Sequence, residues 1–239
     1  MERFKSKPIV LCLVFLMIAS LFSSNAFATI IESPPKTHSW QYTYPDLNTT
    51  PDAQDAANKM TQIGYNGRYG TNYAAATVYD SMRYDAVFYH SGHSSPGRLL
   101  HYDGNNYSYI SAQNGGTNSI SNFSSTDINR MKLAVLDSCE SALTHSTYGN
   151  LLEQLSYVSN NHGVDSSLGF TVILGQVGWG RYFWYHMQQG KTVRQAANDA
   201  AWDVQFYNNG NYHGYDRYSI AGSTSVTIKP AAYGSTSIP

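Results

Sequence analysis

Two apolar runs of strand length, each ending at a reactive side chain, constrain this chain more than any other feature. Residues 132–142 read KLAVLDSCESA, and the apolar run is soon followed by Cys139. Residues 84–95 read YDAVFYHSGHSS, a second apolar run that leads to Gly-His at His93. Short continuous apolar runs are typical of strands buried on both faces of a parallel sheet. Because the chemistry of open α/β sheets gathers outside the carboxyl ends of the strands, the sequence predicts that His93 and Cys139 meet there.

The order of the other elements predicts an α/β fold. Strands and helices alternate along the chain, which predicts a three-layer αβα sandwich with a mostly parallel sheet of about six strands and helices on both faces. We expect strands over residues 38–44, 65–69, 170–174, 218–222 and 224–228, helices over 52–63, 72–82, 148–158, 181–189 and 192–204, and a hairpin over 98–110.

Length and charge restrict the classes of function. At 239 residues the chain is long enough for one sizeable core. Charged residues are 13% of the chain and the net charge is −1, so nothing indicates a polyanionic partner such as nucleic acid. We predict an N-terminal extension over 29–51, one domain over 52–230 and a C-terminal tail over 231–239.

The N-terminus has the pattern of a secretory signal. Basic residues precede an apolar run over 9–22, and Ala26-Phe27-Ala28 supplies a small-x-small cleavage site, which predicts a signal peptide over 1–28 and a secreted or cell-surface protein. The alternative is an uncleaved anchor, although the run is short for a membrane span. After cleavage the mature chain has no membrane span, and Cys139 is its only cysteine. A lone thiol in an exported protein indicates either burial or a reaction.

The two strand-end motifs resemble those of the caspase-like (clan CD) cysteine peptidases, which include caspases, legumains, gingipains and CHAT domains. Residues 88–94, FYHSGHS, look like the histidine motif of gingipains and CHAT domains, and residues 133–141, LAVLDSCES, look like the CHAT cysteine motif. The likeness extends over roughly residues 52–228. It implies a caspase-like fold, a protein or peptide substrate and no cofactor.

The resemblance also implies roles for single residues. Cys139 corresponds to the nucleophile and His93 to the group that protonates the leaving amine. The backbone N–H groups of Cys139 and of the residue after His93 would bind the oxyanion. That residue is Ser94, where the family usually has glycine, and serine keeps the N–H but restricts the backbone.

Three further residues are candidates for substrate binding. Asp137 alternates to the same side of its strand as Cys139, so it either lines a pocket for a basic side chain or caps a turn. Gln176 and Trp179 follow the next strand, where the family places part of its substrate pocket, and packing is the alternative for both. A zinc site at His90, His93 and His101 is a further possibility. Because the first two of these histidines lie three residues apart on a strand and its turn, they do not naturally converge, so no metal is predicted.

Two other functions compete with the peptidase. The first is a catalytically inactive caspase-like domain that acts as a secreted or surface binding protein, which the departure at Ser94 favours. The second is a papain-type amidase in which Cys139 pairs with His162 or His186. That arrangement requires the nucleophile at the start of a helix, whereas Cys139 ends a predicted strand.

Overall fold

The computed structural model describes residues 36–41, 43–44, 47–124, 127–156 and 163–228. The predicted signal peptide (1–28) and the predicted tail (231–239) lie outside the described residues. Among the helices of the described part, none is both long enough and apolar enough to cross a membrane.

A six-stranded sheet forms the centre of the described part of the chain. Its strands lie in the order β11-β10-β9-β5-β1-β4, and every neighbouring pair is parallel except β10 with β11. The prediction of a mostly parallel sheet is therefore confirmed. The strands are β1 (Lys36–Gln41), β4 (Asn66–Thr71), β5 (Val87–Gly92), β9 (Leu133–Ser138), β10 (Ser166–Phe170) and β11 (Tyr218–Gly222).

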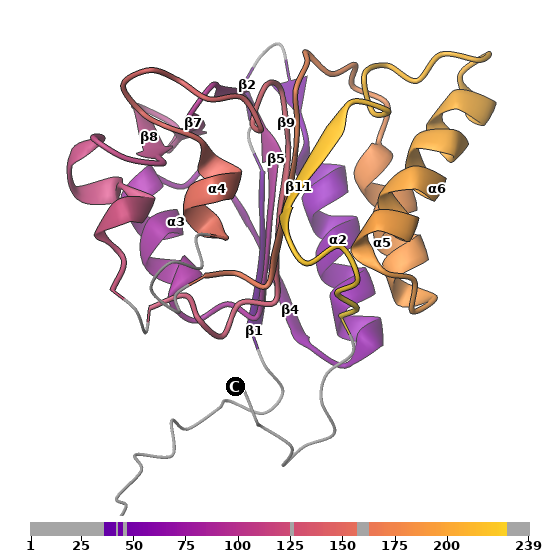
Figure 1. The fold of residues 1–239 in the computed structure, drawn as a ribbon, viewed down its shortest axis with the longest axis horizontal. Helices are drawn as coiled ribbons and strands as arrows, with labels where there is room; N and C mark the ends of the chain where they lie inside the picture. The colour runs from indigo at the N-terminus through magenta and orange to yellow at the C-terminus, as the bar shows by residue number, and fades with distance from the viewer. Residues whose placement is uncertain (1–35, 42, 45–46, 125–126, 157–162, 229–239) are drawn as a thin grey trace, which may run out of the picture. The chain divides into compact units, whose positions relative to one another are not determined.

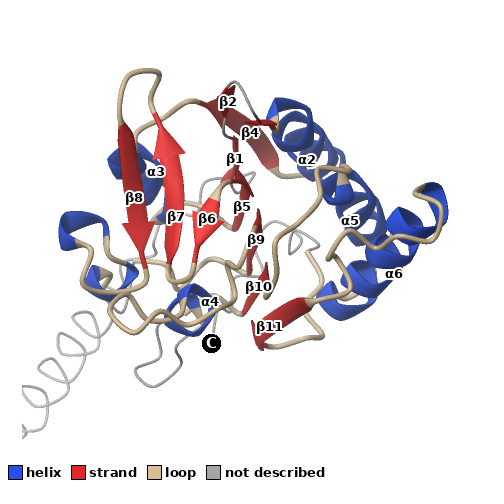
Figure 2. Ribbon diagram, turned by 90° about the horizontal axis from the view of Figure 1, so that it is seen from above, coloured by secondary structure: helices blue, strands red, loops and turns tan. Residues whose placement is uncertain are grey.

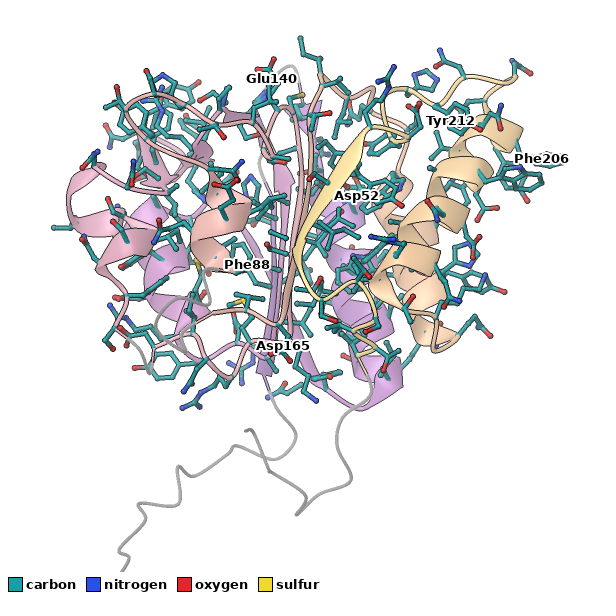
Figure 3. All side chains as sticks on the ribbon, viewed as in Figure 1. Asp52, Phe88, Glu140, Asp165, Phe206 and Tyr212 are labelled. Atoms are coloured by element: carbon teal, nitrogen blue, oxygen red, sulfur yellow. The ribbon has the colours of Figure 1, made fainter. Side chains whose placement is uncertain are left out.

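Helices cover both faces of this sheet, as the αβα prediction requires (Figure 1). One face carries α2, α5 and α6, and the other carries α3 and α4. Side chains alternate between the two faces along each strand: Val87 and Tyr89 pack toward the first face, and Phe88 packs toward the second (Figure 3). The helices are α2 (Thr50–Ile63), α3 (Ala75–Met82), α4 (Leu151–Leu155), α5 (Trp179–Gln188) and α6 (Val193–Tyr207).

A smaller antiparallel sheet follows β5 directly in the chain. It consists of β6 (Ser94–Ser95), β7 (Arg98–Tyr102) and β8 (Tyr107–Ser111), so the predicted hairpin is present (Figure 2). The hairpin packs over α3 on the second face. Two short strands, β2 (Thr43–Tyr44) and β3 (Leu47–Asn48), pair with each other, and two single turns of 3₁₀ helix lie at Gly116–Asn118 and Ile120–Asn122.

Local sequence signals explain where the helices begin and end. A proline occupies the first turn of α2, where its missing N–H costs nothing, and Gly64 ends the helix at φ 105°. Thr192 and Gln195 form a reciprocal capping box at the start of α6. These signals fix helix α2 and α6 close to the predicted bounds.

Several predicted segments differ from the structure. The helix predicted over 148–158 is shorter, because α4 spans only Leu151–Leu155, and residues 157–158 lie outside the described part. β1 lies between β4 and β5, so the sheet starts inside the segment that we assigned to the N-terminal extension (29–51). The strand predicted over 170–174 is wrong apart from Phe170, because β10 spans Ser166–Phe170. The closing strand predicted over 224–228 is also wrong, since these residues form a turn and an irregular segment.

Candidate active site

The register of the two central strands places His93 and Cys139 at equivalent positions beyond one edge of the sheet. β5 and β9 are adjacent and parallel, and Gly92 pairs with Ser138 at the last position of each strand. His93 and Cys139 are therefore the first residues beyond the same edge of the sheet. Both residues are half-buried. Both residues were predicted to follow strands at this edge.

A hydrogen bond joins the two strand ends directly. The Ser94 hydroxyl donates to the backbone carbonyl of Cys139. The Cys139 thiol is free, and its Sγ accepts the Leu174 backbone N–H at 3.4 Å. Because Leu174 belongs to the loop after β10, the segments that follow three neighbouring strands (β5, β9 and β10) meet at Cys139.

The turn after Cys139 is held tightly. Glu140, at the upper end of the sheet in Figure 3, adopts φ 54°, a left-handed conformation that is uncommon for a residue with a side chain. Its N–H donates to the Val172 carbonyl at 3.0 Å. The buried Ser141 hydroxyl lies 2.9 Å from the carbonyls of both Leu136 and Ser138, and it accepts the Phe170 N–H at 3.1 Å. Backbone strain of this kind persists where the surroundings hold it, and it is common at functional sites.

Asp137 is a buried carboxyl group directly before this turn. Its Oδ2 accepts the Tyr89 hydroxyl at 2.8 Å, and Tyr215 also hydrogen-bonds to it. Burial, followed by the negative charge of Asp52, raises the pKa of Asp137 to about 7, and the two tyrosine hydrogen bonds oppose that rise. A carboxylate in this position is poised to gain from an arriving cation, because a positive charge would offset its lost hydration.

Asp52 is a second carboxyl group of the same cluster, and it was not among the site residues predicted from the sequence. It lies in the first turn of α2, where burial and the charge of Asp55 raise its pKa to about 6, against the opposing charge of Arg181. The signal that was available is its position: the helix follows β1, so its first turn lies at the carboxyl edge of the sheet. Only the packing of α2 against the sheet brings the two carboxyl groups together.

Gly180 allows helix α5 to pack closely against the hydrogen-bonded pair of Tyr89 and Asp137. A Cβ atom at this position would lie 2.2 Å from the Tyr89 hydroxyl oxygen and 3.3 Å from Asp137 Oδ2. Any side chain here would therefore displace the Tyr89–Asp137 hydrogen bond. The first turn of α5 needs glycine for this packing reason.

The other two predicted substrate contacts, Gln176 and Trp179, differ in their exposure to solvent. Gln176 is exposed on the loop after β10, and its side-chain amide donates to the Asn48 carbonyl at 3.1 Å. Trp179 has an exposed fraction of 0% and packs against the rings of Phe170, Phe183 and Tyr215. The packing alternative thus describes Trp179, whose ring stacks on that of Tyr215, a hydrogen-bond partner of Asp137.

Two buried histidine rings, those of His90 and His101, lie against each other near the backbone of His93. The rings of His90 on β5 and His101 on β7 lie with centroids 4.9 Å apart, and both are almost fully buried. The sequence had suggested His90 and His101 only as members of a possible zinc site with His93. Within the described ranges, no three side chains of His, Cys, Asp or Glu form a group that could hold a metal ion.

The papain-type alternative does not match the described geometry. Cys139 leads into turns and not into a helix. His186 lies on α5 with both ring nitrogens occupied, Nε2 at 2.8 Å from Asp203 and Nδ1 at 3.0 Å from Lys191. The other candidate partner, His162, lies outside the described residues.

Comparison with known proteins identifies the fold. No protein-family model and no curated protein matches the sequence. The crystal structure of caspase-1 from Spodoptera frugiperda matches with a TM-score of 0.51 at 9% identity, over 83% of this chain and 93% of that chain. A structure of pro-Sf-caspase-1 matches with a TM-score of 0.46 at 12% identity, over 81% and 93%. The chain has a caspase-like α/β fold, and at this level of identity the likeness extends to the fold alone.

Proposed function

We propose that this protein is an exported cysteine endopeptidase that hydrolyses peptide bonds with Cys139 and His93. The observation that carries the proposal is the register of β5 and β9, which sets the two residues one position beyond the paired Gly92 and Ser138. A half-buried free thiol and an imidazole at one sheet edge are the groups that acyl transfer requires.

The reaction follows from these groups. The Cys139 thiolate attacks the peptide carbonyl, and a C–S bond forms while the carbonyl oxygen becomes an oxyanion. The backbone N–H groups of Cys139 and Ser94 stabilise that oxyanion. His93 then gives a proton to the departing amine as the C–N bond breaks. Water attacks the thioester with His93 as base, which releases the carboxylic acid and restores the thiol.

We further propose that the substrate carries a basic side chain next to the cleaved bond. Asp137 stands two residues before Cys139, and Asp52 adds a second carboxyl group whose charge raises the pKa of Asp137. A guanidinium or ammonium group between them would stabilise both carboxylates. Gln176, exposed on the loop after β10, is proposed as a contact at the rim.

The motif resemblance supports a relation to gingipains and CHAT domains, and the N-terminal pattern supports export. Expression of the full chain in a secreting host tests the second point. We expect the mature N-terminus to follow Ala28, as read by N-terminal sequencing of the secreted protein. Retention of the uncleaved chain in the membrane fraction would contradict it.

Iodoacetamide labelling of the purified mature chain tests the dyad. We expect Cys139 to be labelled readily and to lose this reactivity in His93→Ala, because the imidazole that takes the thiol proton is then absent. His145→Ala is the matched control, since the Nδ1 of His145 accepts the Thr147 N–H within its own turn at 3.0 Å. A panel of fluorogenic peptides with Arg, Lys, Asp or Leu before the cleaved bond then tests specificity.

The inactive binding domain remains the second candidate because serine replaces the usual glycine after His93. It predicts slow labelling that His93→Ala does not change, and no turnover of any peptide in the panel.

A further inference from the structure

His90 is a buried imidazole that the proposed chemistry does not use. It lies on β5, its exposed fraction is 1%, and its ring packs edge-on against His101. Its Nε2 faces the backbone carbonyl oxygen of His93 at 3.4 Å. The side chain thus reaches the backbone at the candidate active site from inside the protein.

The surroundings of His90 define which of its nitrogens carries the proton. Burial lowers the pKa of His90 to about 4, so at neutral pH the ring is neutral and has a single N–H. Nε2 faces a carbonyl, which can only accept. Nδ1 is buried with no hydrogen-bond partner among the described residues, and an N–H there would be an orphan donor. Both facts favour the tautomer in which Nε2 donates to His93.

The His93 carbonyl receives a second donor, the Leu100 N–H of β7 at 3.1 Å. This bond flanks the Ser94–Leu99 pair, so that pair is a non-hydrogen-bonded pair of the antiparallel ladder, and the Ser94 N–H is not used by β7. In a trans peptide the C=O and the N–H point in opposite directions. Two donors that hold the His93 carbonyl inward therefore aim the Ser94 N–H outward, away from the hairpin.

We infer that His90 is a positioning residue for the oxyanion site: its Nε2–H holds the His93–Ser94 peptide so that the Ser94 N–H faces the carbonyl oxygen of the substrate. The inference rests on the proposed function and adds a residue to it. Because a donor contributes only when it is aimed before the charge develops, a free rotation of this peptide would weaken the oxyanion interaction in the transition state.

Two variants separate this role from packing. His90→Phe keeps an aromatic ring beside His101 and removes the donor, whereas His90→Gln restores an N–H group at a similar reach. On the best peptide of the panel we expect His90→Phe to lower kcat by about 10- to 100-fold with KM within about twofold, short of the loss of a whole donor, and His90→Gln to recover most of it. Iodoacetamide reacts at a methylene carbon and forms no oxyanion, so the labelling rate of His90→Phe should equal that of the wild type.

The ¹⁵N NMR spectrum of the histidine rings gives a readout that does not need turnover. We expect His90 in the Nε2–H form, and we expect the Ser94 amide signal to shift in His90→Phe and to return in His90→Gln. An Nδ1–H ring, an unchanged kcat in His90→Phe, or slowed labelling in the same variant would overturn the inference. Failure of the proposed function itself looks different: the wild type then turns over no peptide, and His93→Ala labels like the wild type.

Discussion

Replacing Asp137 by asparagine should stabilise the fold at alkaline pH while it removes recognition of a basic substrate. The unfolded chain ionises this carboxyl near its ordinary pKa of 3.8, whereas in the folded protein burial raises the pKa to about 7. Ionisation therefore destabilises the fold as the pH rises through this window, because the unfolded state has already released the proton. At 1.36 kcal/mol per unit, the buried carboxylate costs about 4 kcal/mol at pH 8 and about 2 kcal/mol at pH 5.

Asparagine has nearly the same shape and no charge. Its Oδ1 can accept the Tyr89 hydroxyl, and its amide can donate to the Tyr215 oxygen, so both partners of Asp137 keep a hydrogen bond. We expect the free energy of unfolding of Asp137→Asn, from urea titration, to exceed that of the wild type at pH 8, by an amount about 2 kcal/mol larger than at pH 5.

The same pair of proteins tests the proposed binding of a basic group at Asp137. Arginine amide should raise the melting temperature of the wild type at pH 8 and leave Asp137→Asn unchanged. Asp165→Asn is the control for this binding, because Asp165 lies at the opposite end of the sheet (Figure 3). A stability difference that is the same at both pH values would refute the electrostatic reasoning.

Three further predictions concern residues of the same region. Glu140→Gly should raise the free energy of unfolding by about 1 kcal/mol, because glycine adopts φ 54° without the cost that a Cβ imposes, and Glu140→Ala should show no gain in the same urea titration. Gly180→Ala should lower it by about 1 to 3 kcal/mol, since the added Cβ must displace the Tyr89 hydroxyl; an unchanged midpoint would contradict this packing. Lowering the pH from 6.5 to 4 should destabilise the wild type by about 3 kcal/mol through His90, because over this range the unfolded chain binds a proton at this residue more readily than the folded protein does. In urea titrations across the same range, His90→Phe should lack that share of the acid sensitivity.

The sequence predicted the sheet centre well because the signal there is local. β5 begins with the apolar residues 87–89 and β9 with the apolar residues 133–136, and all six positions of each strand are buried. Burial on both faces could therefore be predicted from these short apolar runs. Their parallel arrangement was predicted from the alternation of strands and helices along the chain, although the connection between these two strands holds a hairpin and two 3₁₀ turns and not an α-helix. The edge at which His93 and Cys139 stand was therefore predictable without coordinates.

β10 was misplaced for a physical reason. The apolar residues Val172, Ile173 and Leu174 suggest a strand, yet Ile173 is 74% exposed. The true strand holds two serines and a glycine: Ser167 donates to the Leu152 carbonyl at 2.9 Å, and a Cβ on Gly169 would lie 2.7 Å from the Ser141 hydroxyl. Small residues are selected here by close packing against α4 and the turn after Cys139, which no local pattern reveals.

The pairing of Asp52 with Asp137 could not be predicted from the sequence for the same reason, and the sequence grouped His90 with His101 only through a possible zinc site. Each joins residues from elements far apart in the chain, and their proximity depends on how α2 and the β7–β8 hairpin pack against the sheet. Titratable side chains of this kind carry no periodicity, so only the packed structure shows which of them share an environment.

The serine after His93 illustrates how a departure from a family motif gains meaning from structure. Ser94 begins β6 and is not among the described residues with positive φ, so its backbone is extended and glycine is not required. Its hydroxyl donates to the Cys139 carbonyl, an interaction that glycine lacks. The peptide before Ser94 is fixed through the His93 carbonyl and the peptide after Cys139 through this hydroxyl and the Glu140 N–H. The substitution therefore links the backbone after His93 to the backbone after Cys139, next to the proposed oxyanion site.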